Sequence, residues 1–200
     1  MTTVFLIRHA VHEAGPDRLA GRLPGIHLSP EGRRQALSLA LRLGDKGLTA
    51  IHASPRERAV STAEAIASAA GLRLEIAHAA DEVDFGTWAG KSFAELEDDA
   101  DWRRWNANRA NAMTPAGERM RDIAARIAGH IDMLTDRYAD GSIAIVTHAE
   151  VIRAAVLHYL DMPIGDYNRL QIDPASITTL ATGAWGAKLC GLNEAASRWS

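Results

Sequence analysis

Arg8 and His9 stand directly after a short apolar run, residues 4–7, and His148 stands after a second run, residues 142–147. Such β-rich runs predict strands buried on both faces, as in a parallel sheet. The carboxyl ends of these strands form the edge where α/β proteins bind ligands. If the two strands are neighbours, their imidazoles face each other across one crevice. A neutral histidine in that place can attack phosphorus and form a phosphohistidine.

Two further side chains can be placed at the same edge. Arg58 lies in the first turn of an expected helix, where free N–H groups and the helix dipole also attract anions. Glu82 lies on the next edge loop, where a carboxyl group can protonate a leaving alkoxide. Each has a simpler interpretation, a surface ion pair for Arg58 and a solvated turn for Glu82. Placed together with Arg8 and the two histidines, they predict a site for a phosphate dianion, because arginine forks match phosphate oxygens.

Strand and helix patterns alternate along the chain. This alternation predicts an α/β fold, a three-layer α-β-α sandwich with a mostly parallel central sheet. Helix starts are indicated at Ser29–Pro30, Ser54–Pro55 and Thr114–Pro115. Further strands are expected at 49–53, 72–77, 177–182 and 188–192. No repeat or linker divides the sequence, so residues 1–200 are expected to form one domain with a helical cap segment at about 88–113.

The composition excludes several classes of protein. The 200 residues carry a formal charge of −3, with 47% hydrophobic and 24% charged residues, which favours neither a nucleic-acid nor a membrane partner. Cys190 is the only cysteine, so no disulfide can form within the chain. The eight histidines show no metal-ligand spacing, and no metal or other cofactor is expected. The apolar start is too short for a signal peptide, which leads us to expect a cytoplasmic protein.

The candidate residues stand within longer motifs, and together these resemble the histidine phosphatase superfamily, the phosphoglycerate-mutase-like proteins. The motifs are Leu6-Ile7-Arg8-His9-Ala10, Leu28-Ser-Pro-Glu-Gly32-x-x-Gln35-Ala36, Ser54-Pro55-x-x-Arg58-Ala59-x-x-Thr62-Ala63, Glu82-x-x-Phe85-Gly86-x-Trp88-x-Gly90, Pro115-x-Gly117-Glu118 and Val146-Thr147-His148. The resemblance runs from residue 4 to beyond residue 180. Several motifs in the right order are far more specific than an arginine-histidine pair alone.

The resemblance implies a role for each candidate residue. His9 is the nucleophile and Glu82 the proton donor and acceptor, while Arg8, Arg58 and His148 complete the phosphate pocket. It also implies a small phosphorylated substrate. We expect a metal-independent reaction, because Arg8, Arg58 and helix N-termini supply the positive charge of the pocket and no carboxylate cluster resembles a magnesium site.

The sequence departs from the family pattern at three positions. Alanine replaces glycine after each catalytic histidine, at Ala10 and Ala149, and alanine is disfavoured where the backbone needs a positive φ. Gly15 stands where the family often has an asparagine that contacts phosphate. That contact is therefore either missing or supplied from elsewhere, with Arg22 and His12 as the candidates.

The family contains hydrolases and mutases, and a mutase must keep water away from the phosphohistidine. Mutase-type members carry a long insertion before the Pro-x-Gly-Glu motif, whereas about thirty residues separate Gly86 from Pro115 here. We therefore expect a phosphatase, with a phosphomutase as the alternative, although the closest family pattern is the one loosely named "probable phosphomutase". A catalytically silent phosphate-binding protein is a third alternative, which retention of the nucleophile and the donor argues against.

Substrate selection is expected to lie in the cap segment. Arg103 and Arg104 stand between Trp102 and Trp105, so they could hold a second phosphate or an aromatic group. The simpler interpretation is slightly favoured: the tryptophans share one helical face and pack inward, and the arginines are solvated. Exposed apolar positions near the C-terminus would allow a homodimer.

Overall fold

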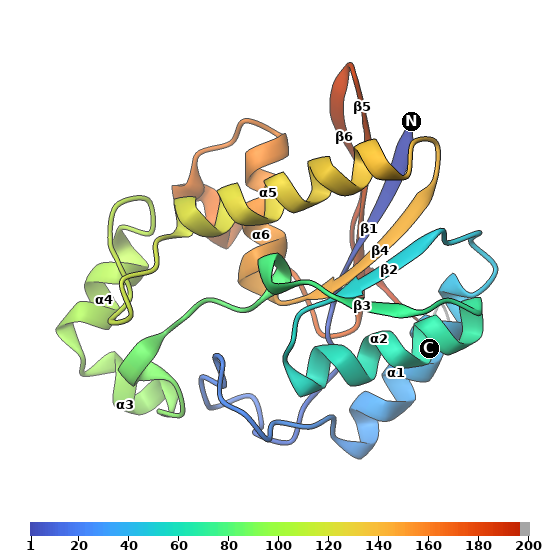
Figure 1. Cartoon of the computed structure of the whole chain (residues 1–200). Coiled ribbons are helices and arrows are strands. Elements are labelled where there is room, and N and C mark those ends of the chain that lie inside the picture. The colour runs from blue at the N-terminus through green and yellow to red at the C-terminus, as the bar shows by residue number, and fades with distance from the viewer. Residues whose placement is uncertain (197–200) are drawn as a thin grey trace.

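The computed structural model describes residues 1–196, and its centre is one six-stranded sheet in the order β3-β2-β4-β1-β5-β6 (Figure 1). The strands are β1 Thr2–Arg8, β2 Ala50–Ala53, β3 Leu74–Ile76, β4 Ser142–Thr147, β5 Ser176–Gly183 and β6 Gly186–Ala195. The first four are mutually parallel where they pair, and β5 and β6 add an antiparallel edge. The expectation of a mostly parallel sheet is confirmed.

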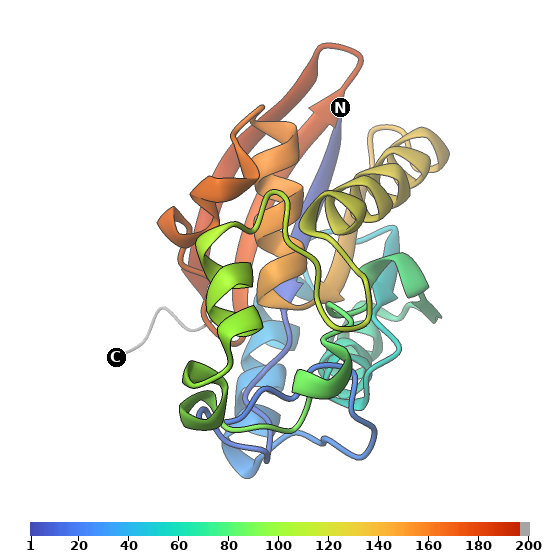
Figure 2. The same cartoon turned by 90° about the vertical axis from the view of Figure 1, so that its left-hand side faces the viewer.

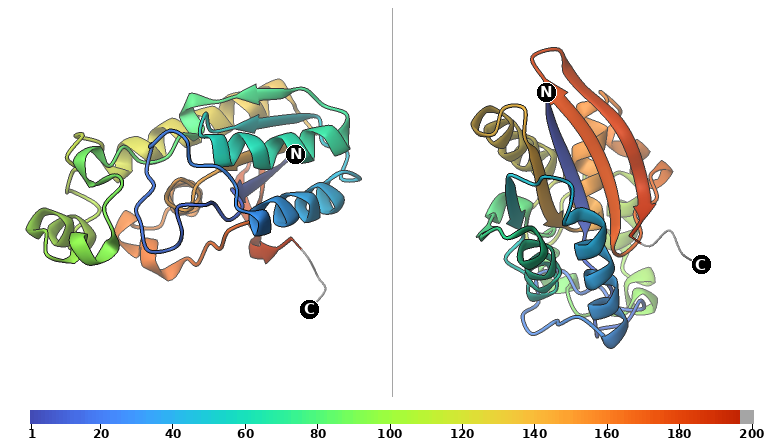
Figure 3. Two further views of the ribbon diagram at one scale, coloured as in Figure 1. Left: turned by 90° about the horizontal axis from the view of Figure 1, so that it is seen from below. Right: turned by 90° about the vertical axis from the view of Figure 1, so that its right-hand side faces the viewer.

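Two helices cover each face of the sheet (Figure 1; Figure 3). α1 Pro30–Leu43 and α2 Glu57–Ala70 pack on one face, and α5 Met120–Arg137 and α6 Ala149–Tyr159 on the other. Alternate residues of β4 serve the two layers, because side chains of a strand point to opposite faces. Ile143 and Ile145 pack under α5 and α6, while Ala144 and Val146 pack under α1 and α2. The structure is therefore the expected three-layer sandwich.

A small helical cap lies beyond the carboxyl edge of the sheet. It contains α3 Phe93–Glu97 and α4 Ala100–Ala107, which stand in front of the strands in Figure 2. The rings of Trp88, Trp102 and Trp105 contact one another, with centroid separations of 5.2 to 5.9 Å. This aromatic cluster fixes the cap against the segment that carries Glu82. Three short 3-10 helices complete the described part of the chain, His78–Ala80, Gly86–Trp88 and Ile164–Arg169.

Two expected helix starts are wrong, and both for a tertiary reason. α2 begins at Glu57 with no side-chain cap, because the hydroxyl of Ser54 binds other partners at the carboxyl edge. α5 begins at Met120 rather than at Thr114. The Thr114 hydroxyl instead donates to the carbonyl oxygen of Asp84 at 2.6 Å. The start at Ser29 is confirmed, since its hydroxyl accepts from the N–H of Gly32 at 3.0 Å.

Across residues 1–196, none of the helices combines the length and the apolar character that crossing a membrane requires.

Candidate active site

His9 and His148 lie side by side at the carboxyl edge of the sheet. Each directly follows its strand, and β1 and β4 pair in parallel with Arg8 opposite Thr147. The backbone N–H of His9 donates to the carbonyl oxygen of Thr147 at 2.9 Å. The two ring centroids are 5.1 Å apart, and both side chains are buried. The parallel register therefore brings both imidazoles into one site, as the sequence predicts.

The hydrogen-bond partners of the His9 ring determine which nitrogen carries the proton. Nδ1 lies 2.8 Å from the carbonyl oxygen of Ala10, which can only accept, so Nδ1 bears the hydrogen. Nε2 accepts from Nε of Arg58 at 3.2 Å and holds the lone pair. Burial, together with the charges of Arg58 and Arg8, lowers the pKa of His9 well below its ordinary value. The ring is therefore neutral near neutral pH, and Nε2 can act as a nucleophile.

Arg8 and Arg58 bring two positive charges to this nitrogen. Nη2 of Arg58 donates to the carbonyl oxygen of Gly21 at 2.7 Å, and Nη1 of Arg8 donates to that of Ile172 at 2.7 Å. Within the described residues, Nη1 of Arg58 and Nε of Arg8 are buried and have no hydrogen-bond partner. Buried donors are normally paired, so these two indicate the place of an anionic ligand.

His148 is held by a chain of hydrogen bonds on its far side. Its Nδ1 accepts from Nη2 of Arg58 at 3.3 Å, so Nε2 bears the hydrogen and donates to the Ser54 hydroxyl at 2.8 Å. The Ser54 hydroxyl in turn lies 3.2 Å from a carboxylate oxygen of Asp81. Burial lowers the pKa of His148 well below its ordinary value, and Arg58 adds to this effect. Ser54 and Asp81 therefore orient a neutral imidazole, a role that the sequence analysis missed.

Glu82 lies next to His148. One of its carboxyl oxygens is 3.5 Å from Nδ1 of His148, and its side chain is 13% exposed. Burial raises the pKa of Glu82 to about 7, against the opposing effect of Arg58. A carboxyl group with this pKa exists in both forms near neutral pH, so it can give a proton and take one back.

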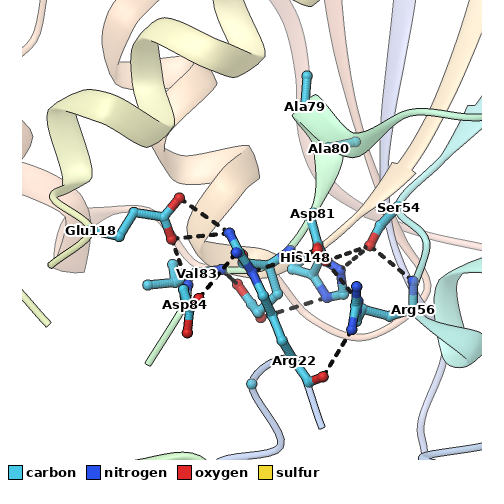
Figure 4. Close-up of polar contacts among 12 residues, drawn as sticks. Arg22, Ser54, Arg56, Ala79, Ala80, Asp81, Val83, Asp84, Glu118 and His148 are labelled. Carbon is cyan, nitrogen blue, oxygen red and sulfur yellow. Dashed lines mark hydrogen bonds and ion pairs between the residues drawn. The ribbon is translucent and has the colours of Figure 1, made fainter. Parts of the chain in front are cut away.

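The segment that carries Glu82 is fixed by two arginines. Nε of Arg22 and Nη2 of Arg126 donate to the backbone carbonyl oxygen of Glu82, at 2.7 and 3.3 Å. Figure 4 shows the guanidinium of Arg22 beside Asp84 and Glu118, with which it pairs at 3.3 and 3.2 Å. Glu118 also pairs with Arg126, at 3.3 Å. Arg22 was expected to contact substrate; it does not line the cavity and instead positions the Glu82 loop.

A cavity of about 730 Å³ lies between the edge of the sheet and the cap. We call its two ends the histidine end and the cap end. The histidine end is lined by Arg8, His9, His12, Arg58 and Glu82. The cap end is lined by Phe93, Trp102, Trp105, Asn106, Arg109, Glu150, Arg153 and Tyr167. A cavity of this size accommodates a small organic molecule rather than a bare ion.

Arg109 connects the cap to the sandwich, and the sequence analysis missed it. Its guanidinium carbon lies 3.4 Å from the ring centroid of Trp105 and 4.1 Å from that of Tyr167. Nη1 pairs with Glu150 at 2.8 Å, and Glu150 also pairs with Arg153 at 2.9 Å. Glu150 and Arg153 stand one turn apart at the start of α6, directly after His148, and that spacing is the signal that could have revealed them.

Arg103 and Arg104 lie outside the cavity lining, so the expectation that they bind substrate is not supported by their positions. Arg104 pairs with Asp101 and its side chain is 72% exposed, and Arg103 donates to the carbonyl oxygen of Glu97. Trp105 is buried and Trp102 half-buried on the opposite face of α4. The simpler interpretation of this helix, with tryptophans inward and arginines outward, is confirmed.

The two alanines that replace glycines keep ordinary backbone geometry. Among the described residues, Ala10 and Ala149 are not in the positive-φ group. The N–H of Ala10 donates to the Thr62 hydroxyl at 3.1 Å. Neither position requires glycine, so the substitutions leave the backbone at both histidines unstrained.

No group of three or more His, Cys, Asp or Glu side chains in residues 1–196 is arranged to hold a metal ion.

Comparison with known proteins gives a consistent result. The model of the histidine phosphatase superfamily, branch 1, matches residues 4–195. Phosphoserine phosphatase 1 of Hydrogenobacter thermophilus is 28% identical over 185 residues, covering 90% of this chain and 86% of that protein. A probable phosphoglycerate mutase, GpmB, of Escherichia coli is 26% identical over 180 residues, covering 89% of this chain and 84% of that one.

Similarity extends to solved structures. A mutant phosphoserine phosphatase of Entamoeba histolytica, in complex with phosphoserine, matches with a TM-score of 0.87 and 26% identity, covering 96% of this chain and 97% of that one. The phosphoserine phosphatase of that organism in complex with 3-phosphoglyceric acid matches with a TM-score of 0.85 and 27% identity, covering 97% of this chain and 98% of that one. These matches confirm the fold.

Proposed function

Because the chain belongs to the histidine phosphatase superfamily, branch 1, we propose that its cavity hydrolyses small phosphomonoesters with His9 as the nucleophile. The protein is a histidine-type phosphatase. The observation that carries the role of His9 is the tautomer of its ring: Nδ1–H is held by the Ala10 carbonyl, and the Nε2 lone pair lies beside Arg58.

The first half of the reaction transfers the phosphoryl group to His9. The Nε2 lone pair attacks phosphorus, the P–O ester bond breaks, and Glu82 gives its proton to the leaving alkoxide. Arg58 donates to this lone pair in the free site, so the entering substrate must displace that contact. The unpaired N–H groups of Arg8 and Arg58 then bind the phosphoryl oxygens.

The second half releases phosphate. Ionised Glu82 takes a proton from water, the resulting oxygen nucleophile attacks phosphorus, and the P–N bond to His9 breaks. Glu82 is again protonated and His9 again neutral, so the site returns to its starting state. Arg8 and Arg58 hold the phosphoryl oxygens throughout, and no metal ion is required in this scheme. His148 adds a donor to them once its Nδ1 gains a proton, because the one N–H of its neutral ring donates to Ser54.

A phosphomutase is the alternative, since the chain also resembles a protein named as a probable mutase. Hydrolysis is favoured because the segment between Gly86 and Pro115 forms only two short α-helices, of 5 and 8 residues. A mutase must keep water from the phosphohistidine until the phosphoryl group returns to an acceptor.

The test is a hydrolysis screen over alkyl and aryl phosphomonoesters, including phosphoserine and 3-phosphoglycerate, with and without a chelator. Release of inorganic phosphate, unaffected by chelator, supports the proposal. Phosphohistidine should appear in the quenched wild-type enzyme, identified as acid-labile label. Transfer to an acceptor hydroxyl in place of phosphate release would establish the mutase, and acid-stable label would exclude His9 as the nucleophile.

A further inference from the structure

His12 lies in the same cavity as the nucleophile, and the reaction described above does not use it. It lines the histidine end, with its ring centroid 5.5 Å from that of His9. Its Nδ1 is buried and, within residues 1–196, has no hydrogen-bond partner. A buried imidazole nitrogen without a partner beside an anion site is a candidate ligand for that anion.

The backbone on both sides of His12 is fixed. The N–H of Val11 donates to the Gln35 side chain at 3.0 Å, and the N–H of Glu13 donates to the carbonyl oxygen of His27 at 2.9 Å. His12 itself forms an isolated antiparallel bridge with Leu28. The imidazole is therefore held at the cavity wall by α1 and the segment before it, and does not sit there as the end of a free loop.

Gly15, three residues after His12, contributes no polar side chain to the cavity. Gly15 lines the cavity with φ at +75°, and a Cβ added there would meet no atom within 4 Å. Position 15 therefore contributes no side chain to the cavity, and His12 is a polar side chain of the same loop that lines it together with Arg8 and Arg58.

The charges around His12 favour the neutral ring when the site is empty. Arg8 at the end of β1, Arg58 of α2 and Glu82 line the same cavity as His12, and the ring of His9, directly after β1, lies beside it. Burial, with the charges of Arg58 and Arg8, lowers the pKa of His12 to about 4. A phosphate dianion between these groups reverses the local field, because a nearby negative charge favours the protonated imidazole.

We propose that His12 is a further ligand of the phosphoryl group and that it takes up a proton from solvent as the dianion enters the site. This inference rests on the proposed function, since it assigns a ligand to the same phosphate. The neutral imidazole gains one proton and becomes an imidazolium that donates to a phosphoryl oxygen. Binding of the dianion therefore strengthens as the pH falls.

The test measures proton uptake on binding of tungstate, a tetrahedral dianion that does not protonate near neutral pH. Calorimetric titrations in buffers of different ionisation enthalpy give the number of protons taken up. Glu82 also gains protons when an anion binds, so the measurement is made in the Glu82→Gln protein, with and without His12→Gln. We expect His12→Gln to remove most of the uptake and to weaken tungstate binding roughly tenfold or more at mildly acidic pH, with a smaller loss at alkaline pH.

Unchanged proton uptake after His12→Gln, or a loss of affinity that is equal at every pH, would overturn the proposal. His27→Gln is the matched control, because His27 is an exposed histidine of the same segment outside the cavity lining, and it should change neither quantity. Thermal unfolding of each variant checks its fold. If the wild-type protein binds tungstate with His12-dependent proton uptake but has no phosphatase activity, the proposed function is refuted and this inference stands. If it has phosphatase activity but no His12-dependent proton uptake, the inference is refuted and the proposed function stands.

Discussion

At the histidine end of the cavity the backbone places the reacting groups, whereas at the cap end side chains hold one another. His9 and His148 each follow a strand, and the register of β1 with β4 fixes their separation. Arg109 is instead held by stacking on Trp105 and Tyr167 and by its pair with Glu150. The first arrangement is rigid and cannot vary without rebuilding the sheet. The second can vary with single substitutions, so the chemistry should be robust and the substrate preference adaptable.

The largest effect should come from His9 at the histidine end. His9→Ala removes the nucleophile, and we expect kcat/KM to fall by roughly 10⁴-fold or more for every substrate, with no acid-labile phosphoenzyme. Steady-state kinetics measure kcat/KM, and quenched labelling measures the phosphoenzyme. His158→Asn is the control, because this exposed histidine lies far from the cavity on α6. Turnover near the wild-type rate in His9→Ala would show that His9 is not the nucleophile and that the histidine end does not carry the chemistry.

Glu82 is the proton donor at the histidine end, so the effect of its loss should depend on the leaving group. We expect Glu82→Gln to slow hydrolysis of an alkyl phosphate by roughly 10²- to 10⁴-fold. An activated aryl phosphate should lose much less in its first step, because its leaving group hardly needs a proton. Asp84→Asn is the control, since Asp84 is 42% exposed and pairs with Arg22. If Asp84→Asn alone shows the leaving-group dependence, Asp84 is the donor.

Arg109 should contribute to the stability of the cap and not to phosphate binding. Arg109→Ala removes the pair with Glu150 and the stacking on Trp105 and Tyr167, while Glu150 keeps Arg153 as its partner. We expect the free energy of unfolding to fall by about 2 kcal/mol. KM for phosphomonoesters should rise while tungstate affinity stays near wild type. Arg104 is an exposed arginine of the same cap, so Arg104→Ala is the control and should change neither the free energy of unfolding nor KM. If Arg109→Ala weakens tungstate binding by the same factor by which it raises KM, the two ends of the cavity are not independent.

The pH profile should report the histidine end. Glu82 must be protonated to donate, so kcat/KM should fall by about tenfold per pH unit above its pKa of about 7. His9 must be neutral, and its lowered pKa moves the acidic limb well below its ordinary value of 6.5. Rates measured across pH with an alkyl phosphate test this, and Glu82→Gln should lose the basic limb. A basic limb that survives in Glu82→Gln belongs to another group.

The smallest effect should come from Phe93, which lines the cap end. Its ring lines the cavity and is 40% exposed, so Phe93→Ala should raise KM several-fold for bulky apolar esters and hardly change it for phosphoserine. Met113→Ala is a matched control, because Met113 is 51% exposed and lies outside the cavity lining. A uniform change over all substrates would indicate that Phe93 acts through the fold of the cap.

The histidine end could be predicted from sequence because its signals are local. The apolar run 142–147 coincides with β4, so the place of His148 followed directly from the end of that run. Arg58 was placed well even though α2 starts later than expected, since it still lies in the first turn. Local patterns of hydrophobicity and helix capping are strong wherever a buried strand leads into a loop or helix.

The remaining features depend on partners that are distant in sequence. The Ser54 hydroxyl could cap a helix or bind His148, and only the folded sheet edge decides between them. Arg22 has the charge of a phosphate ligand, but Glu118 and Asp84 meet it under the Glu82 loop. Arg109 pairs with Glu150 across 41 residues, and no periodicity predicts such a contact. Tertiary competition for polar groups therefore limits sequence-based prediction here.

The position of β1 also determines when the enzyme can be completed during its synthesis. β1 ends at Arg8, and its two neighbours, β4 and β5, begin at Ser142 and Ser176. A chain emerging from the ribosome must carry this apolar strand without its partners until most of the protein has been made. Pairing over such a separation is slow, and unpaired strand edges invite aggregation and the help of chaperones. Recovery of activity after dilution from denaturant should therefore be a late event of refolding, reporting closure of the central strands.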